Sequence, residues 1–332
     1  MKIAINGFGR IGRNFLRTIV QDAAAQKKLS VVVINIGPAN PEFVAHMFKY
    51  DTLLGIWPGT VSYANKKLII DGHSIDVIAV MDPTALDWAP YGIDWVVDAT
   101  GAFTKREKAV LHLQAGAGHV LITAPAEGDD ITIIPGVNSS LFDSKKHKIV
   151  SLGSCTTNAF MPMLKVLNDE FGITQGFMTT VHAYTNSQVL LDVEAHSLRL
   201  SRAAALNIIP STTGAAKTLE KVLPQLTGIV KAGSIRVPVG KVSLIDLVVT
   251  TKKEISRETI NDAFKDAASG LLKGIVSVSY EPLVSTDYSG NPFSVTIDAE
   301  LTDTTGTMAH VFGWYDNEWG YSQRLKDFLT SI

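Results

Sequence analysis

The chain has 332 residues, and its 30 lysines and arginines against 32 aspartates and glutamates give a formal net charge of −2. At roughly 150 residues per domain, this length predicts about two domains. The balanced charge argues against nucleic-acid binding, which needs a clustered basic excess. The single cysteine excludes an intrachain disulfide, and we expect no metal site. With no signal-like start and no long apolar run, the expected location is cytoplasmic, away from membranes.

Strand-like and helix-like patterns alternate over the first 150 residues. Residues 2–6 predict a strand, residues 10–20 an amphipathic helix, and residues 29–34 a second strand that is apolar enough to be buried on both faces. The alternation continues at 68–70, 75–80, 95–97, 105–115 and 120–122. Such an order predicts an α/β domain built as a doubly wound, mainly parallel sheet with helices on both faces.

The pattern changes after residue 150, where strand-like runs dominate and fewer helices separate them. Ser256 precedes a capped helix at 257–268, and residues 317–329 predict a last helix. The strand-like runs lie at 176–182, 234–239, 244–250, 275–280, 293–298 and 310–314. The second domain is therefore expected to be α+β, with an antiparallel or mixed sheet.

Three glycines, Gly7, Gly9 and Gly12, lie between the first strand and the first helix. This is the dinucleotide fingerprint in its required context. The first glycine permits a tight turn, the second lets the backbone approach a pyrophosphate, and the third lets helix and strand pack closely. The free N–H groups of the following helix then face the phosphates. The alternative, a simple turn, is less favoured in this context.

The fingerprint also predicts a carboxylate about 20 residues further on, which would bind the adenosine ribose of NAD. No carboxylate follows the second strand before Glu42, and no arginine or lysine replaces it. The sequence therefore predicts a permissive site that takes NAD and does not repel the 2′-phosphate of NADP.

The only cysteine, Cys155, follows small polar residues and begins a helix-compatible stretch. The first turn of a helix lowers a thiol pKa and favours thiolate, so we expect a nucleophile rather than a core cysteine. Among the eight histidines, His182 has the best setting for a partner, at the end of a strand. The other seven are expected to lie on the surface or in the core.

A dinucleotide domain combined with a cysteine nucleophile predicts covalent aldehyde oxidation. The thiolate adds to an aldehyde, the adduct loses a hydride to a nicotinamide, and an acceptor resolves the thioester. Direct oxidation of an alcohol would not need the cysteine.

Five blocks of the sequence resemble the phosphorylating glyceraldehyde-3-phosphate dehydrogenase family, and they occur in that family's order across nearly the whole chain. The blocks are AINGFGRIGR at 4–13, SCTTN at 154–158, HAYTN at 182–186, STTGAAK at 211–217 and WYDNE at 314–318. The resemblance implies a Rossmann domain at 1–154, a catalytic domain at 155–316, a last helix at 317–332 that packs back on the first domain, and a homotetramer.

By position, the resemblance makes Cys155 the nucleophile and His182 its general acid/base. Thr185 and Arg236 would hold the phosphate of glyceraldehyde 3-phosphate. The attacking inorganic phosphate would be held by Ser154, Thr156, Thr213, Gly214 and either Arg199 or Arg202, with Arg199 favoured. Charge supports these roles, because two anionic groups flank one thioester.

The resemblance also implies a set of cofactor-binding residues. They are Asn6, Gly7, Phe8, Gly9, Arg10, Ile11 and Gly12 in the glycine loop, Thr100, Gly101 and Thr123 near the ribose and nicotinamide, and Asn317 at the carboxamide. The expected product is 1,3-bisphosphoglycerate, formed reversibly. Two alternatives stay open: the sister activity on erythrose 4-phosphate, and a Rossmann-fold binding protein without catalysis.

Overall fold

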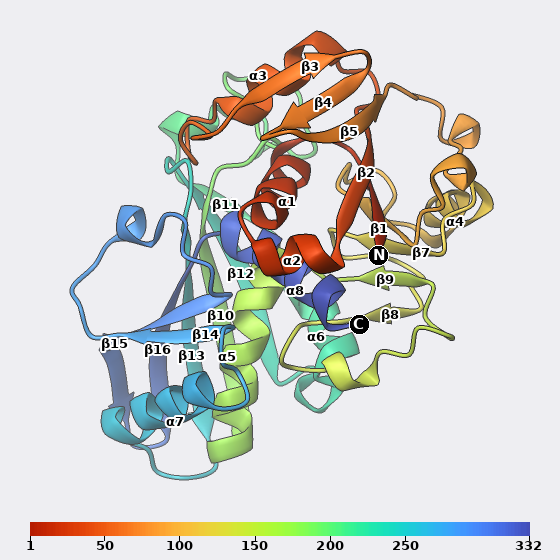
Figure 1. Ribbon diagram of the computed structural model, residues 1–332. Coiled ribbons are helices and arrows are strands. Elements are labelled where there is room, and N and C mark those ends of the chain that lie inside the picture. Colours follow the sequence, from red (N-terminus) through yellow and green to blue (C-terminus); the bar gives the residue numbers. More distant parts are fainter. The chain divides into compact units, whose positions relative to one another are not determined.

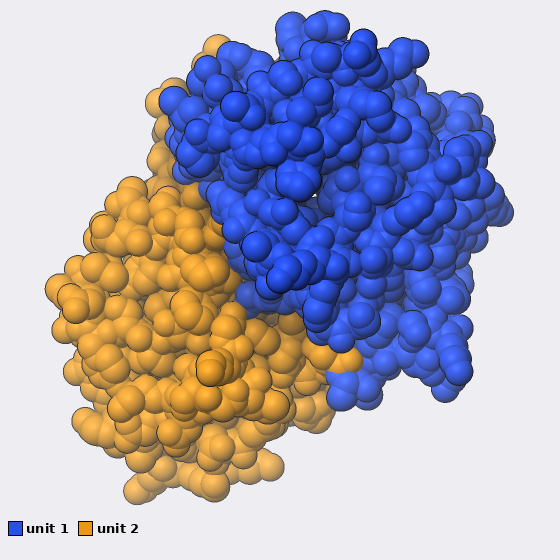
Figure 2. Space-filling model, viewed as in Figure 1, with its two compact units in different colours: residues 1–133, 140–153, 322–332 blue, residues 134–139, 154–321 orange.

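The computed structural model describes residues 1–332 (Figure 1), and the chain separates into two compact units. Unit 1 comprises residues 1–133, 140–153 and 322–332, and unit 2 comprises residues 134–139 and 154–321 (Figure 2). Each unit contains one sheet with its own buried core. None of the helices is both long and apolar enough to cross a membrane.

Unit 1 is built on a nine-stranded sheet in the order β3-β4-β5-β2-β1-β6-β7-β9-β8. In this order across the sheet, all neighbours from β5 through β2, β1, β6, β7 and β9 to β8 pair in parallel. The strands β3, β4 and β5 form an antiparallel meander at one edge. The strand bounds are Lys2–Asn6 (β1), Ser30–Asn35 (β2), Val61–Ala64 (β3), Lys67–Ile70 (β4), His73–Ile78 (β5), Trp95–Asp98 (β6), His119–Ile122 (β7), Ile131–Thr132 (β8) and Ile149–Ser151 (β9).

Four helices of unit 1 connect these strands, and the end of the last helix of the chain belongs to the same unit. In that helix Lys326 Nζ lies 2.7 Å from Asp22, and the Phe328 ring meets the Trp95 ring edge to face. The helix bounds are Arg10–Val20 (α1), Ala23–Lys28 (α2), Val44–Lys49 (α3), Arg106–Gln114 (α4) and Trp319–Ser331 (α8).

Unit 2 contains a seven-stranded sheet in the order β11-β12-β10-β13-β16-β15-β14. Four of its six strand pairs are antiparallel, and β10–β12 and β14–β15 are parallel. The strand bounds are Ile173–Ala183 (β10), Ile209–Ser211 (β11), Val230–Val237 (β12), Ser243–Thr251 (β13), Val276–Ser279 (β14), Val295–Thr305 (β15) and Met308–Tyr315 (β16). The predicted fold class, a doubly wound parallel domain plus an α+β domain with a mostly antiparallel sheet, is confirmed.

Three helices belong to unit 2: α5 (Cys155–Phe171), α6 (Ala215–Val222) and α7 (Arg257–Ser269). They contribute to one apolar core with the sheet, in which Phe160 of α5 and Phe264 of α7 are fully buried. Because α5 packs in this core while its first residue is Cys155, the position of the thiol is fixed by the packing of a whole helix.

Candidate functional site

The loop after β1 has the backbone geometry that the glycine spacing predicts. Gly7 has a φ of +93°, and its N–H donates to the Asn35 carbonyl at 2.9 Å. A Cβ on Gly12 would lie 2.2 Å from the Gly7 carbonyl oxygen, whereas a Cβ on Gly9 would meet nothing within 4 Å. Gly12 is therefore needed for packing, and Gly9 leaves open space above the start of α1 that a phosphate can enter.

A cavity of about 420 Å³ lies beside this loop in unit 1. Its lining is mostly apolar and holds no carboxylate; Arg13 is its single charged residue. The lining residues are Gly7, Phe8, Gly9, Arg13, Ile36, Ala39, Asn40, Phe43, Val44, Met47, Ala99 and Thr100. An apolar slot next to a glycine loop at a helix N-terminus suits the adenosine and pyrophosphate of a dinucleotide.

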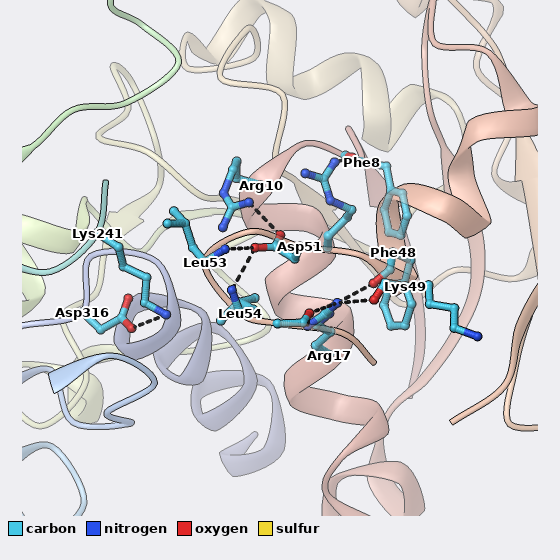
Figure 3. Close-up of polar contacts among 12 residues, drawn as sticks. Phe8, Arg10, Arg17, Phe48, Lys49, Asp51, Leu53, Leu54, Lys241 and Asp316 are labelled. Atoms are coloured by element: carbon cyan, nitrogen blue, oxygen red, sulfur yellow. Dashed lines mark hydrogen bonds and ion pairs between the residues drawn. The ribbon is translucent and has the colours of Figure 1, made fainter. Parts of the chain in front are cut away.

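Arg10 carries a charge that is already compensated. Its guanidinium lies 2.6 Å from the Asp51 carboxylate, which also accepts from the N–H groups of Leu53 and Leu54 (Figure 3). Burial opposes ionisation of Asp51, but Arg10 and the two N–H groups lower its pKa below the usual value. The arrangement ties the start of α1 to the loop after α3 and leaves backbone N–H groups to face a pyrophosphate.

Asn6, a predicted cofactor residue, has a side chain that is hydrogen-bonded by its neighbours. Its side-chain amide donates to Asp98 at 2.7 Å and accepts from Asn35 at 2.8 Å, and it is almost fully buried. Asp98 also accepts from the Thr100 hydroxyl and lies 3.2 Å from His112 Nε2. Asn6 therefore supports the glycine loop from below.

The remaining cofactor candidates of unit 1 lie near the ends of neighbouring strands. Thr100 and Gly101 follow β6, and Thr123 follows β7, with its N–H donating to the Asp98 carbonyl. Thr100 lines the cavity. Phe8 also lines the cavity, and Ile11 lies in the first turn of α1.

In unit 2, Cys155 is the first residue of α5, and its sulfur lies 3.4 Å from His182 Nε2. Ser154 caps this helix: its side chain accepts from the Thr157 N–H, and the Thr157 hydroxyl accepts from the Ser154 N–H. This reciprocal capping fixes the backbone on both sides of the thiol. The structure thus brings together the two residues that the sequence separates by 27 positions.

The second nitrogen of His182 shows where its proton lies. Nδ1 lies 2.6 Å from the Ala183 carbonyl oxygen, which can only accept, and we place the proton on Nδ1 because this contact is shorter than the contact with Arg236 Nη1, which can only donate. Nε2 is then left with a lone pair directed at the sulfur. Arg236 Nη1 donates to the same carbonyl at 3.0 Å and lies 2.8 Å from Nδ1.

The pKa shifts of this group place the proton on sulfur in the unliganded protein. Burial raises the pKa of the Cys155 thiol, although the positive charge of Arg236 and hydrogen bonds at Thr156 oppose this effect. Burial, followed by the Arg236 charge, lowers the pKa of His182 to about 4. Desolvation therefore opposes the thiolate that the helix N-terminus is expected to favour.

Arg236 has no acidic partner within this group. Its side chain is partly buried, its Nε has no hydrogen-bond acceptor, and burial lowers the pKa of the guanidinium. A desolvated cation without a counter-ion is costly, so the arrangement favours an anionic ligand beside Cys155 and His182.

Other predicted phosphate ligands lie on loops of unit 2. The Thr185 hydroxyl contacts Ser187 at 2.9 Å, and Gly214 immediately precedes α6, with the Thr213 hydroxyl accepting from the Ala215 N–H. Arg202 is paired with Asp192 at 2.7 Å, whereas Arg199 is exposed and has no carboxylate partner. Arg199 therefore stays the proposed phosphate ligand of the two.

Asn317 is held at the start of the last helix. Its side-chain carbonyl accepts from Ser243 at 3.2 Å, which leaves its NH₂ group as the donor. The preceding Asp316 pairs with the buried Lys241 at 3.0 Å (Figure 3) and accepts from the Trp319 N–H. A fixed amide donor suits a carbonyl oxygen of a ligand.

Sequence reasoning assigned no role to Tyr315, Ser243, Asp98 or Asp51, although their side chains hold predicted site residues. Tyr315 and Asp98 each end a strand, and each lies two positions before a predicted site residue, Asn317 and Thr100 respectively. Their position, as polar residues at the end of a buried strand, was the feature of the sequence that could have indicated a role in the site. The partner that it would meet could not be read from the sequence.

Comparison with known proteins agrees with this geometry. Residues 1–106 match the model of the glyceraldehyde 3-phosphate dehydrogenase NAD binding domain, and residues 154–317 match the model of its C-terminal domain. Over 334 aligned residues the chain is 48% identical to glyceraldehyde-3-phosphate dehydrogenase 1 of Bacillus subtilis and 49% identical to glyceraldehyde-3-phosphate dehydrogenase of Priestia megaterium, covering 100% of this chain and 98% of each relative. The enzyme of Geobacillus stearothermophilus is 48% identical with the same coverage. The chain belongs to the glyceraldehyde-3-phosphate dehydrogenase family.

Proposed function

We propose that this protein catalyses the reversible oxidation of glyceraldehyde 3-phosphate, with inorganic phosphate and NAD, to 1,3-bisphosphoglycerate. The observation that carries the proposal is the group formed by Cys155, His182 and Arg236, in which a thiol, a base and an uncompensated cation meet. Full-length similarity to enzymes of this name supports it.

In the first step His182 Nε2 takes the thiol proton while the sulfur of Cys155 attacks the aldehyde carbon. His182 then returns that proton to the former carbonyl oxygen, which gives a thiohemiacetal with a hydroxyl group. An Arg236 guanidinium bound to the substrate phosphate no longer opposes a second proton on His182, so substrate binding itself makes the base effective. Thr185, on the loop that follows β10, would hold the same phosphate.

Oxidation follows when His182 removes the hydroxyl proton of the adduct and the C–H bond breaks. A bound nicotinamide supplies the acceptor of the hydride. Asn317, with its amide fixed by Ser243, would orient the carboxamide. The result is a thioester on Cys155.

The thioester is resolved by phosphate, whose oxygen attacks the carbonyl carbon while the Cys155 thiolate leaves. The proposed ligands of this phosphate are Ser154, Thr156, Thr213, Gly214 and Arg199. The exposed Arg199 has no carboxylate partner, and the N-terminus of α6 at Gly214 adds free backbone N–H groups.

For the cofactor, we propose that NADP is accepted alongside NAD. The cavity of unit 1 fits an adenosine, and no carboxylate in its lining would repel a 2′-phosphate. Titration of the apo-protein with both dinucleotides tests this: we expect dissociation constants within about tenfold of each other. A difference above a hundredfold would refute it.

We propose that the protein works as a homotetramer. Unit 2 exposes an unusual number of large apolar side chains within 20 residues of sequence, which is typical of a surface covered by another subunit. They are Leu190, Leu191, Val193, Leu198, Leu206 and Ile208. Light scattering should give four times the mass of the chain, and Leu198→Asp should lower it.

A cytoplasmic location is also proposed, because a nucleophilic thiol must stay reduced and the chain has a single free cysteine. Activity should follow the cytoplasmic fraction on cell fractionation.

The test of the catalytic proposal is Cys155→Ser, assayed with glyceraldehyde 3-phosphate, phosphate and NAD. A hydroxyl is a far weaker nucleophile at neutral pH, so turnover should fall by a factor on the order of a thousand or more. Retained turnover would refute the covalent mechanism. Running wild type with erythrose 4-phosphate in parallel tests the substrate: we expect the higher kcat/KM for glyceraldehyde 3-phosphate, and the reverse order would assign the sister activity.

A further inference from the structure

Tyr315 ends β16 inside unit 2, and its hydroxyl joins two other elements of that unit. The oxygen lies 3.0 Å from the hydroxyl of Thr156 and 2.7 Å from the hydroxyl of Thr180. Thr156 belongs to α5 and directly follows Cys155, whereas Thr180 belongs to β10 and precedes His182 by two positions. One hydroxyl therefore links the helix that carries the thiol to the strand that carries the imidazole.

The link acts close to both groups. Residues two apart on a strand face the same side of a sheet, so Thr180 and His182 share a face of β10. The Tyr315 ring also meets the His182 ring edge to face, with centroids 6.0 Å apart and an interplanar angle of 76°. Tyr315 thus restrains the backbone that carries His182 and the orientation of its ring.

The phenol can serve both threonines at once. Tyr315 is almost fully buried, and burial raises its pKa, so the hydroxyl keeps its proton throughout the working pH range. A neutral phenol has one proton to donate and a lone pair to accept with, which matches two partners. Each threonine hydroxyl can take the complementary role.

We propose that Tyr315 is a positioning residue that sets the separation of Cys155 Sγ and His182 Nε2 by joining Thr156 to Thr180 through its hydroxyl. The inference rests on the proposed function for the roles of Cys155 and His182. Proton transfer from sulfur to nitrogen depends on a contact of 3.4 Å, and no backbone hydrogen bond joins the first turn of α5 to the end of β10. The two threonines and Tyr315 supply that connection.

The test uses alkylation of the apo-protein by iodoacetamide across pH 6 to 10. Because Cys155 is the single cysteine of the chain, the rate reports this thiol alone and needs neither cofactor nor substrate. Tyr315→Phe removes one oxygen and keeps the ring. We expect the rate near pH 7 to fall roughly three- to tenfold, the value of one lost hydrogen bond, and the difference from wild type to shrink towards pH 10, where hydroxide rather than His182 can take the thiol proton.

A matched substitution separates positioning from general weakening of the fold. Tyr288→Phe removes the phenol oxygen of another buried tyrosine, whose ring stacks on the ring of Trp314. Trp314 precedes Tyr315 on β16, so its side chain points to the opposite face of the sheet. We expect the alkylation profile of Tyr288→Phe to match that of wild type. A profile that shifts equally in both variants would overturn the proposal.

A second variant keeps the proposal testable if Tyr315→Phe does not fold. Thr180→Val breaks one arm of the link with little change of volume, and we expect a shift in the same direction. An unchanged pH profile in either folded variant would overturn the positioning role. The outcome is independent of the proposed function, which fails only if wild type does not oxidise glyceraldehyde 3-phosphate.

Discussion

Each unit contains a buried group of polar side chains at the ends of its strands, and the two groups differ in how completely they are satisfied. In unit 1, Asp98 accepts from Asn6, lies within hydrogen-bond distance of His112 Nε2, and accepts from the Thr100 hydroxyl. Trp88 donates to the other nitrogen of His112. The negative charge has several donors around it, and the group needs nothing from outside.

In unit 2 the corresponding group is incomplete. Arg236 has no carboxylate partner and an Nε without an acceptor, while the pKa of His182 lies at about 4 because of burial and the adjacent guanidinium. The thiol of Cys155 has a raised pKa for the same reason of burial. Under the proposed function, an anion and a carbonyl of the substrate would complete this group.

The comparison teaches that hydrogen-bond completeness distinguishes a scaffold from a site. A satisfied buried network fixes backbone geometry, and removing a member should cost stability more than chemistry. An unsatisfied network contains a charged group that only a ligand can pair. Removing a member should therefore lower catalytic activity more than it lowers the free energy of unfolding.

The largest effect is expected from Arg236→Leu. Losing a buried, charge-assisted contact to the substrate phosphate should lower kcat/KM for glyceraldehyde 3-phosphate about 100- to 1000-fold. Glyceraldehyde without the phosphate should lose less than about tenfold, since it never used the contact. Thermal stability should change little or rise, because a desolvated cation is removed.

Arg236→Lys serves as the matched control, because it keeps the charge and loses the guanidinium fork. Its kcat/KM should lie between those of wild type and Arg236→Leu. An equal loss for both aldehydes would show that Arg236 acts on the Cys155–His182 pair rather than on the phosphate.

The next effect concerns the pH dependence of stability. The unfolded chain binds a proton at His182 near pH 6.5, whereas the folded chain binds it only near pH 4. The free energy of unfolding should therefore fall as the pH drops through this window, by about 3 kcal/mol from this group alone. Above pH 6.5 the group makes no further difference.

Urea unfolding between pH 4 and pH 7 gives the free energy of unfolding of wild type and of His182→Asn at each pH. The difference between the two slopes of this free energy against pH is the contribution of His182. Arg236→Leu should shrink the wild-type slope, because one cause of the low pKa is gone. Parallel slopes for wild type and His182→Asn would mean that His182 titrates normally and that unit 2 is as well satisfied as unit 1.

The fold could be predicted from the sequence where the apolar pattern was continuous. Most buried strands of unit 1 lie within a few residues of their predicted bounds, because their central positions are apolar. The short buried strand β9 was not predicted. The prediction failed at the second half of β15, which runs on to Thr305. Its residues after Ala299 alternate with exposed positions and include Glu300 and Asp303, so no apolar run marks them.

The site could be predicted only in part. Residue types and local context selected Cys155, His182 and the three glycines, since their chemistry depends on a strand end or a helix start. The charge state could not be predicted, because the pKa of Cys155 depends on burial by residues distant in sequence. Nor could the compensation of Arg10, whose partner Asp51 lies 41 positions away.

A third prediction tests unit 1. Asp98→Asn keeps the shape of the side chain but places an NH₂ group where donors already point, so the free energy of unfolding should fall by about 2 kcal/mol. The kcat of the folded variant at saturating cofactor should stay within about threefold of wild type. A large loss of kcat at unchanged stability would break the contrast between the two units.

The smallest effect separates two glycines of one loop. Gly12→Ala places a Cβ 2.2 Å from the Gly7 carbonyl and should destabilise unit 1, whereas Gly9→Ala meets nothing within 4 Å and should leave the melting temperature unchanged. The added methyl at Gly9 instead occupies the space into which a pyrophosphate would fit, so we expect NAD binding to weaken about tenfold. Titration with NAD and with nicotinamide mononucleotide, which lacks the adenosine half and the pyrophosphate link, measures this, and only NAD should lose affinity. If Gly9→Ala binds NAD as tightly as wild type does, the phosphates do not approach this part of the loop. Gly9 would then have a structural role only, like the buried network of Asn6 and Asp98.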